Sequence, residues 1–240
     1  MKKLTKIRLI NWHYFANETI HVKNNTLITG QNATGKSTIV DAVAFIITAG
    51  DQIFNLAANE KSKRDLRGYV KCKLGIDNQE YLREGDTTGH VALEFFDEGK
   101  QTFFTAGAVI DVFGEILPPK VLFYHIDGMI EDNFFVDKDG KILTTSQFKK
   151  AKSATKVYLT RREAKLAFRS LFGSINETYF SLIPKALAFK PIPDVKDFIY
   201  RYLLEEKILD VDSIKESINS YRDLEATLKV IKKKVPAALS

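Results

Sequence analysis

The residues best suited to chemistry in this chain form a short glycine-containing segment near its beginning. Gly30 and Gly35 enclose four residues, and Lys36 and Ser37 follow directly. Glycines let the backbone curl so that successive N–H groups point inward, where they and the N-terminus of a following helix surround phosphate oxygens. In this pattern the lysine reaches the β- and γ-phosphates, and the serine hydroxyl binds Mg²⁺. The segment therefore predicts a site for ATP with Mg²⁺.

The predicted nucleotide site comprises the consecutive residues Gly30, Gln31, Asn32, Ala33, Thr34, Gly35, Lys36, Ser37 and Thr38. We expect Lys36 to stabilise transition-state charge and Ser37 to be the Mg²⁺ ligand. The pattern requires a preceding strand and a following helix. Alternation in Asn25–Thr29 predicts the strand, and the apolar run after Gly35 predicts a buried helix to about Ala49. A glycine turn matching by chance would leave this context unexplained.

A complete catalytic set is not predicted within the chain. Hydrolysis also needs an apolar strand ending in Asp-Glu, which holds Mg²⁺ and polarises water. The nearest candidate is Val121–Asp127, but His125 interrupts its apolar run and Gly128 stands where the catalytic acid should be. This segment is more typical of a plain strand followed by an Asp-Gly turn. We expect the missing residues to come from elsewhere.

The elements that position the site are predicted from periodicity and turn residues. Strand patterns occur at Lys6–Ile10, Thr19–Val22, His90–Phe96, Thr102–Phe113 and Lys120–Ile126, the last three forming a meander. Helical patterns follow Gly140, and Thr160 with Glu163 matches a capping box before Ala164–Phe172. The predicted fold class is α/β: a P-loop NTPase with an antiparallel β meander, a helical subdomain and the start of a coiled coil. The predicted domains are residues 1–145, 146–208 and 209–240.

The end of the sequence carries the pattern of a coiled coil. Its apolar positions are Ile214, Ile218, Tyr221, Leu224, Leu228, Ile231 and Val235. From Tyr221 their spacing alternates between three and four residues, which is a heptad seam. A helix over residues 211–235 would extend about 37 Å at ~1.5 Å per residue, and so narrow a stripe requires a partner helix. We expect the chain to be part of a longer or divided protein.

Three sequence segments together resemble one family of ATPases. Ile7–Phe15, Leu27–Thr38 and the pair Asp41-Ala42 are similar to the amino-terminal half-head of SMC-type ATPases. Three further segments resemble the MukB/MksB-like condensins, especially the JetC subunits of Wadjet plasmid-defence systems: Phe54–Val70, Tyr81–Gly85 and Lys185–Ile192. The similarity covers nearly the whole chain.

The resemblance implies that a carboxy-terminal half-head supplies the signature motif and the Asp-Glu strand that are missing here. It also implies a second head, so that ATP joins two heads in a homodimer, together with kleisin-type subunits and double-stranded DNA as partners. Arg64 or Arg67 is then expected to approach nucleotide or DNA. The family's glutamine loop has no match, because Ser181–Ile192 lacks glutamine and Gln147 lies early. The implied function is ATP-driven DNA engagement, translocation or loop extrusion, in chromosome maintenance or anti-plasmid defence.

A strongly basic segment lies between residues 149 and 173, with eight basic residues against the single acid Glu163. Four of the basic residues fall on one predicted helix: Arg161, Arg162, Lys165 and Arg169. Several share a face at helical spacing, where they could contact the phosphates of duplex DNA. An ordinary solvated face is the alternative.

Composition limits the remaining classes of function. The 240 residues are 45% hydrophobic and 28% charged, with a net charge of +6, as in an ordinary globular protein. No apolar run is long enough for a signal peptide or a membrane span, so we expect a cytoplasmic protein without membrane contact. The resemblance implies that it is nucleoid-associated. A single cysteine, Cys72, excludes an internal disulfide, and the four histidines lack metal-ligand spacing.

Two other hypotheses come from different classes of function. A self-contained small P-loop kinase or nucleotide hydrolase would complete its chemistry within 240 residues, with residues 160–169 as an arginine-rich lid. A regulatory nucleotide sensor would bind ATP without catalysis. The heptad helix and the missing acidic strand disfavour the kinase.

Overall fold

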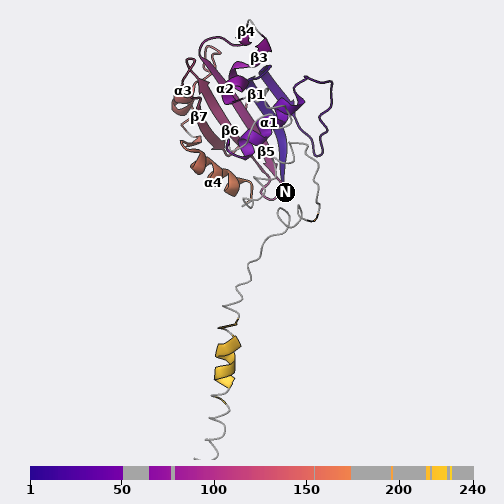
Figure 1. Ribbon diagram of the computed structural model, residues 1–240, viewed down its shortest axis with the longest axis vertical. Coiled ribbons are helices and arrows are strands. Elements are labelled where there is room, and N and C mark those ends of the chain that lie inside the picture. The colour runs from indigo at the N-terminus through magenta and orange to yellow at the C-terminus, as the bar shows by residue number, and fades with distance from the viewer. Residues whose placement is uncertain are drawn as a thin grey trace, which may run out of the picture. The chain divides into compact units, whose positions relative to one another are not determined.

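The computed structural model describes residues 1–50, 65–76, 79–153 and 155–173, together with residues 196, 215–216, 218–225 and 228. The chain divides into two compact units, Met1–Ile192 and Pro193–Ser240, which are treated separately below. The first unit is mixed α/β and contains a mostly antiparallel sheet (Figure 1).

Six strands form the main sheet in the order β2-β1-β5-β6-β7-β8, and every neighbouring pair is antiparallel. In chain order the strands are β1 Lys2–Trp12, β2 Phe15–His21, β5 Thr87–Asp97, β6 Thr102–Val112, β7 Lys120–Ile126 and β8 Lys156–Tyr158. The predicted meander is confirmed as β5, β6 and β7. Its first turn is held by the Asp97 carboxylate, which accepts hydrogen bonds from the backbone N–H groups of Gly99 and Lys100.

Alternating side chains of the strands build a core on each face of this sheet. Leu9 and Phe123 face one core, which also contains Phe45 and Phe168. The next residues along the two strands, Ile10 and Tyr124, face the other core. The second core is closed by Ile130, Phe135, Leu143 and Phe148. The sheet is therefore covered on both faces.

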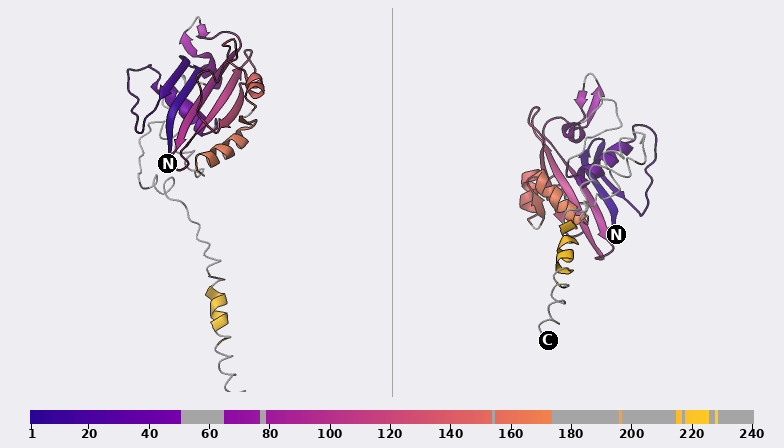
Figure 2. Two further views of the ribbon diagram at one scale, coloured as in Figure 1. Left: turned by 180° about the vertical axis from the view of Figure 1, so that it is seen from behind. Right: turned by 60° about the horizontal axis from the view of Figure 1, so that its bottom comes forward.

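Helices α1 (Lys36–Ile47) and α4 (Arg161–Leu171) share the first face, while α3 (Thr145–Ala151) packs on the second. Figure 2 shows these helices around the sheet from two further directions. The prediction of a buried helix after the phosphate loop holds for one side of α1, where Phe45 and Ile46 are fully enclosed. Its other side is only half-buried, at Ile39, Val43 and Ile47. An apolar stripe of α1 thus remains partly accessible.

The strand predicted at Asn25–Thr29 is not formed. Residues 26–30 have no regular secondary structure, and Leu27 is 85% exposed. A strand needs a neighbour for its N–H and C=O groups, and both edges of β1 are already occupied by β2 and β5. In Figure 1 the stretch between β2 and α1 extends from the body as an open loop.

One helix start differs from the sequence expectation, and another has a capping box that was not predicted. Thr160 accepts a hydrogen bond from the Glu163 N–H at 3.2 Å, but the Glu163 carboxylate bonds the N–H of Leu159 rather than that of Thr160. The predicted capping box of α4 is therefore only half formed. A complete box occurs at α3, between Thr144 and Gln147.

Smaller elements complete the described residues. Helix α2 (Leu66–Lys71) is followed by the hairpin of β3 (Lys73–Ile76) and β4 (Gln79–Tyr81). In the second unit residues 218–225 are helical, and the predicted seam residues Ile218, Tyr221, Leu224 and Leu228 are exposed. The coiled coil stays a prediction, since Ile214, Ile231 and Val235 lie outside the described residues. None of the described helices is long and apolar enough to cross a membrane.

Candidate functional site

The phosphate loop occupies residues 30–35 and ends at the N-terminus of α1. Its backbone has positive φ angles at Gly30 (154°), Ala33 (66°) and Gly35 (92°), which is the left-handed curvature that turns successive N–H groups inward. Thr34 stabilises the bend, because its hydroxyl donates to the Gln31 carbonyl at 2.9 Å. A Cβ at Gly30 would lie only 2.9 Å from that hydroxyl oxygen. The curl therefore depends on glycine.

The N-terminus of α1 is open toward the loop. Gly35 is the N-cap residue and provides no side chain to bond the first N–H groups, and the first turn contains no acid. These N–H groups carry partial positive charge and favour an anion. Ser37 is exposed at this end of the helix. The arrangement matches what the β-phosphate and a serine-bound Mg²⁺ require.

The Lys36 side chain reaches back to the first two residues of the loop. Its ammonium donates to the carbonyls of Gly30 at 2.8 Å and Gln31 at 2.5 Å. Both acceptors belong to the loop itself, so the charge is held where it would meet the phosphates. The lysine is placed by residues five and six positions earlier.

The turn between β1 and β2 supports this loop from outside. A Cβ at Gly35 would approach the Phe15 ring to 2.8 Å, and the Trp12 indole donates to the Thr38 carbonyl at 2.9 Å. Trp12 is fully buried and lies against Phe45 and Tyr69, with ring centroids 5.7 and 4.6 Å away. Sequence analysis missed these supporting roles. The sequence signal that could have indicated them is the run of ring-bearing residues from Trp12 to Phe15, at the junction of β1 and β2.

Asp41 fixes the helix rather than facing a ligand. Its carboxylate is 5% exposed and accepts a hydrogen bond from the hydroxyl of Tyr69 on α2. The contact joins α1 to α2, while the backbone N–H of His13 donates to the Tyr69 carbonyl at 2.7 Å. The loop, α1, α2 and the β1–β2 turn are thereby held together.

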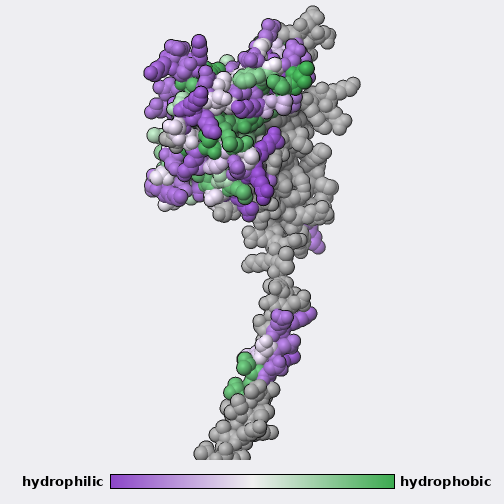
Figure 3. Space-filling view, turned by 90° about the vertical axis from the view of Figure 1, so that its left-hand side faces the viewer, coloured by the Kyte–Doolittle hydropathy of each residue, from purple (hydrophilic) through white to green (hydrophobic). Residues whose placement is uncertain are grey.

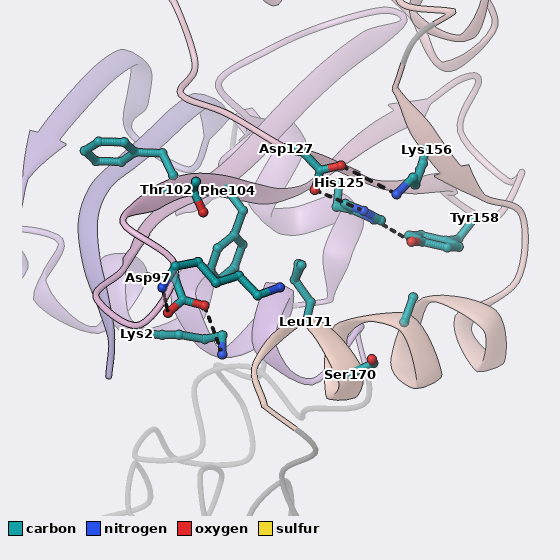
Figure 4. Close-up of a pocket in the computed structure, with 13 residues that line it drawn as sticks. Lys2, Asp97, Thr102, Phe104, His125, Asp127, Lys156, Tyr158, Ser170 and Leu171 are labelled. Atoms are coloured by element: carbon teal, nitrogen blue, oxygen red, sulfur yellow. Dashed lines mark hydrogen bonds and ion pairs between the residues drawn. The ribbon is translucent and has the colours of Figure 1, made fainter.

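The acidic candidate Asp127 lies away from the residues that form the loop. It follows the end of β7, its side chain is 74% exposed, and its carboxylate is 3.5 Å from Lys156 and 3.9 Å from His125. It lines a separate cavity of about 770 Å³ bounded by the β5–β6 turn, β7, β8 and α4 (Figure 4). The strand-and-turn interpretation of Val121–Asp127 agrees with this position.

The cavity in Figure 4 also lacks an activated nucleophile. His125 Nδ1 lies 2.5 Å from the Tyr158 hydroxyl, but burial lowers the pKa of the histidine and raises that of the tyrosine. Both groups are therefore neutral near pH 7, and the hydrogen bond joins β7 to β8. Among the described residues no group of three or more metal-ligating side chains occurs.

Arg67 is held by its own chain. It is 9% exposed, and its guanidinium donates to the carbonyl of Gly114 at 2.7 Å and to that of Leu117. These bonds fix the loop between β6 and β7. Arg64 lies outside the described residues, and contact of either arginine with nucleotide or DNA stays a prediction.

The basic residues predicted to contact DNA do lie on one helix, α4. Arg161 and Arg162 are exposed, whereas Lys165 and Arg169 are half-buried. Figure 3 faces the side of the molecule that carries α3 and α4, where hydrophilic residues surround several groups of hydrophobic ones. Gln147, considered for a glutamine loop, instead accepts a hydrogen bond from the Thr144 N–H at 2.9 Å.

Comparison with protein families identifies the same region. Residues 4–61 match the family model described as the P-loop containing region of AAA domain. A comparison with curated proteins finds no match. The chain therefore contains a P-loop nucleotide-binding region. Such regions bind nucleotides, typically with Mg²⁺, and nucleotide hydrolysis is their general activity.

Proposed function

We propose that this chain is the ATP-binding half of an SMC-like head, in which ATP binding and hydrolysis drive DNA engagement, translocation or loop extrusion. The observation that carries the proposal is a curled phosphate loop whose preceding segment, residues 26–29, pairs with no strand of the described residues. P-loop domains place that segment within a sheet, because a buried backbone must pair its N–H and C=O groups.

The surface around the loop fits a missing sheet. Leu27 and Ile28, which enter the loop, are 85% and 40% exposed. The half-buried stripe of Ile39, Val43 and Ile47 lies on the helix that follows. Covering such apolar surface contributes about 25 cal/mol per Å². We infer that a complementary carboxy-terminal half-head supplies strands that pair with residues 26–29 and cover this stripe.

ATP and Mg²⁺ are the proposed ligands. The N–H groups of the loop and of the first turn of α1 would hold the β-phosphate, Lys36 would bridge the β- and γ-phosphates, and Ser37 would ligate Mg²⁺. The remaining Mg²⁺ ligand and the water-polarising acid would come from the complementary half. A second head, kleisin-type subunits and double-stranded DNA complete the proposed assembly, in chromosome maintenance or anti-plasmid defence.

A self-contained kinase or nucleotide hydrolase is the competing function. It would need its own sheet around the loop. The described residues place none beside Leu27 and Ile28, which favours the half-head over the kinase.

ATP binding by the purified chain tests the proposal directly. Lys36→Ala removes one charge-assisted contact worth ~1.5–3 kcal/mol, so we expect the affinity for labelled ATP to fall about ten- to a hundredfold. Lys23→Ala, which changes an exposed lysine outside the loop, is the matched control. Unchanged affinity in Lys36→Ala would remove the loop from its proposed role.

A further inference from the structure

A second cavity, apart from the phosphate loop, is lined by three cations that form no ion pair with a carboxylate of the described residues. It has a volume of about 580 Å³ and lies where α2, the β3–β4 hairpin and the β6–β7 loop meet. Its lining residues are Arg67, Lys71, Glu80, Tyr81, Arg83, Glu84, Gly85 and Glu115. Three of these are cations, and each is at least partly buried.

The two arginines donate hydrogen bonds to backbone carbonyls, which carry no full negative charge. Among the described residues, Arg67 donates to the carbonyls of Gly114 and Leu117. Arg83 uses one terminal nitrogen for the carbonyls of His13 at 2.8 Å and Val70 at 3.1 Å. In the described part of the chain, no carboxylate lies within 4 Å of either guanidinium.

Lys71 also has no carboxylate of the described residues paired with it. It is 6% exposed, and its ammonium lies over the Tyr81 ring, 5.6 Å from the centroid. The nearby acid Glu80 is instead paired with Lys73 at 3.3 Å. Burial also lowers the pKa of the Arg83 guanidinium. These side chains are largely buried, and no carboxylate of the described residues is paired with them, so the cavity favours an anion.

The donors that remain are numerous. A guanidinium has five N–H groups and an ammonium has three. The bonds described above leave N–H groups on Arg67, Arg83 and Lys71 unused. A phosphate group offers three or more strong acceptor oxygens and about two negative charges, whereas a carboxylate offers two oxygens and one charge. Three clustered cations therefore match phosphate better.

The rim of the cavity selects for a compact ligand. Glu80, Glu84 and Glu115 line it, and all three are exposed. Successive phosphates of duplex DNA would face these carboxylates, while a single phosphate group reaching the three cations would not. We propose that this cavity is a second anion site that binds one phosphate group, either as the free ion or at the end of a small molecule.

The experiment separates this site from the phosphate loop. In the full chain carrying Lys36→Ala, inorganic phosphate is titrated at constant ionic strength and followed by ³¹P line width. Binding should persist in this background. Adding Lys71→Gln should weaken it about tenfold or more, since one charge-assisted contact is lost. Adding Lys23→Gln, which changes an exposed lysine outside the lining of the cavity, should leave it unchanged. Because the loop is disabled throughout, the proposed function is not a premise of this result.

A gain-of-binding variant guards against misfolding. Glu115→Gln removes a rim carboxylate and should tighten phosphate binding by up to about fivefold, the range expected for one exposed charge. Adenosine monophosphate and a short DNA duplex are then tested as competitors. Competition by the monophosphate alone supports a terminal phosphate, and competition by neither supports the free ion.

Three results would overturn the proposal: loss of all phosphate binding in Lys36→Ala, equal binding with and without Lys71→Gln, or equally strong displacement by acetate. Tight competition by the duplex would reject the compact-ligand assignment.

Discussion

The contact between Phe15 and Gly35 joins two segments that sequence analysis treated separately. Gly35 has a φ of 92°, a conformation that L-residues rarely adopt, and its missing side chain leaves room for the Phe15 ring. The same glycine begins α1, so the conformation of the phosphate loop depends on the packing of the β1–β2 turn.

Gly35→Ala should impair nucleotide binding through both strain and contact. The added Cβ would lie 2.8 Å from Phe15 Cζ, and the positive φ costs a further ~1–2 kcal/mol. We expect the free energy of unfolding to fall by about 1–3 kcal/mol and ATP affinity to fall at least tenfold. Gly140→Ala is the control, because Gly140 also has a positive φ but no atom near its Cβ position. Equal effects in the two variants would refute the Phe15 contact.

His90 provides a pH dependence at the residue scale. The side chain is fully enclosed in the second core, and its Nε2 lies 2.9 Å from the Leu143 carbonyl. Burial lowers its pKa to about 3. The neutral ring must carry its proton on Nε2, since a carbonyl can only accept.

Stability should therefore decrease as the pH falls. Below pH 6.5, the approximate pKa of histidine in the unfolded chain, the unfolded chain binds a proton that the folded chain does not. The free energy of unfolding should therefore fall progressively from about pH 6.5 toward pH 3, by up to ~1.4 kcal/mol per pH unit. His90→Gln keeps a donor for Leu143 and should flatten urea-unfolding stability across that window. His21→Gln, which removes an exposed histidine, should not. An unchanged slope in His90→Gln would contradict the assignment.

At the scale of elements, helix α4 presents its charges on an amphipathic frame. Ala164 and Phe168 are buried against the first core, while Arg161 and Arg162 are exposed at the start of the helix. Arg161 also approaches the end of α1, where its Nε lies 3.5 Å from the Cβ position of Gly50. The basic end of α4 is thereby adjacent to the helix that begins at the phosphate loop.

The predicted DNA contact of α4 can be measured as a salt dependence. Each phosphate neutralised lowers log affinity by about 0.9 per unit of log salt, so Arg161→Glu with Arg162→Glu should weaken duplex binding and flatten the slope by about two. Fluorescence anisotropy over a salt series measures both quantities. The control is Lys149→Glu with Lys150→Glu on α3, which packs on the other face of the sheet. A double α4 variant with unchanged affinity and slope would leave the cluster as a solvated face.

At the scale of the whole molecule, the proposed half-head would hold one half of a nucleotide site. We expect the purified chain to release phosphate from ATP negligibly, and a complementary half with an Asp-Glu strand to raise turnover in a Lys36-dependent manner. Asp127→Asn should not change turnover, because Asp127 lines the cavity formed with α4. Robust activity of the chain alone that vanishes in Asp127→Asn would instead support a self-contained enzyme.

Local features were accessible from the sequence alone. The phosphate loop, the start of α1 near Lys36 and the β5–β6–β7 meander follow from patterns within a few residues of one another. Glycine curvature, helix capping and strand alternation are short-range properties of the backbone, so each can be read without knowing the fold.

Long-range features were decided by the tertiary structure. Pairing partners determine whether an alternating segment becomes a strand. Residues 26–29 pair with no described strand, and β2 and β5 occupy both edges of β1. Packing brought Phe15 to Gly35 and Tyr69 to Asp41. It also gathered Lys71 and Arg83 into one cavity, since the β3–β4 hairpin reverses the chain between them. Sequence spacing carries no information about such contacts, because they depend on how separate elements fold back on one another.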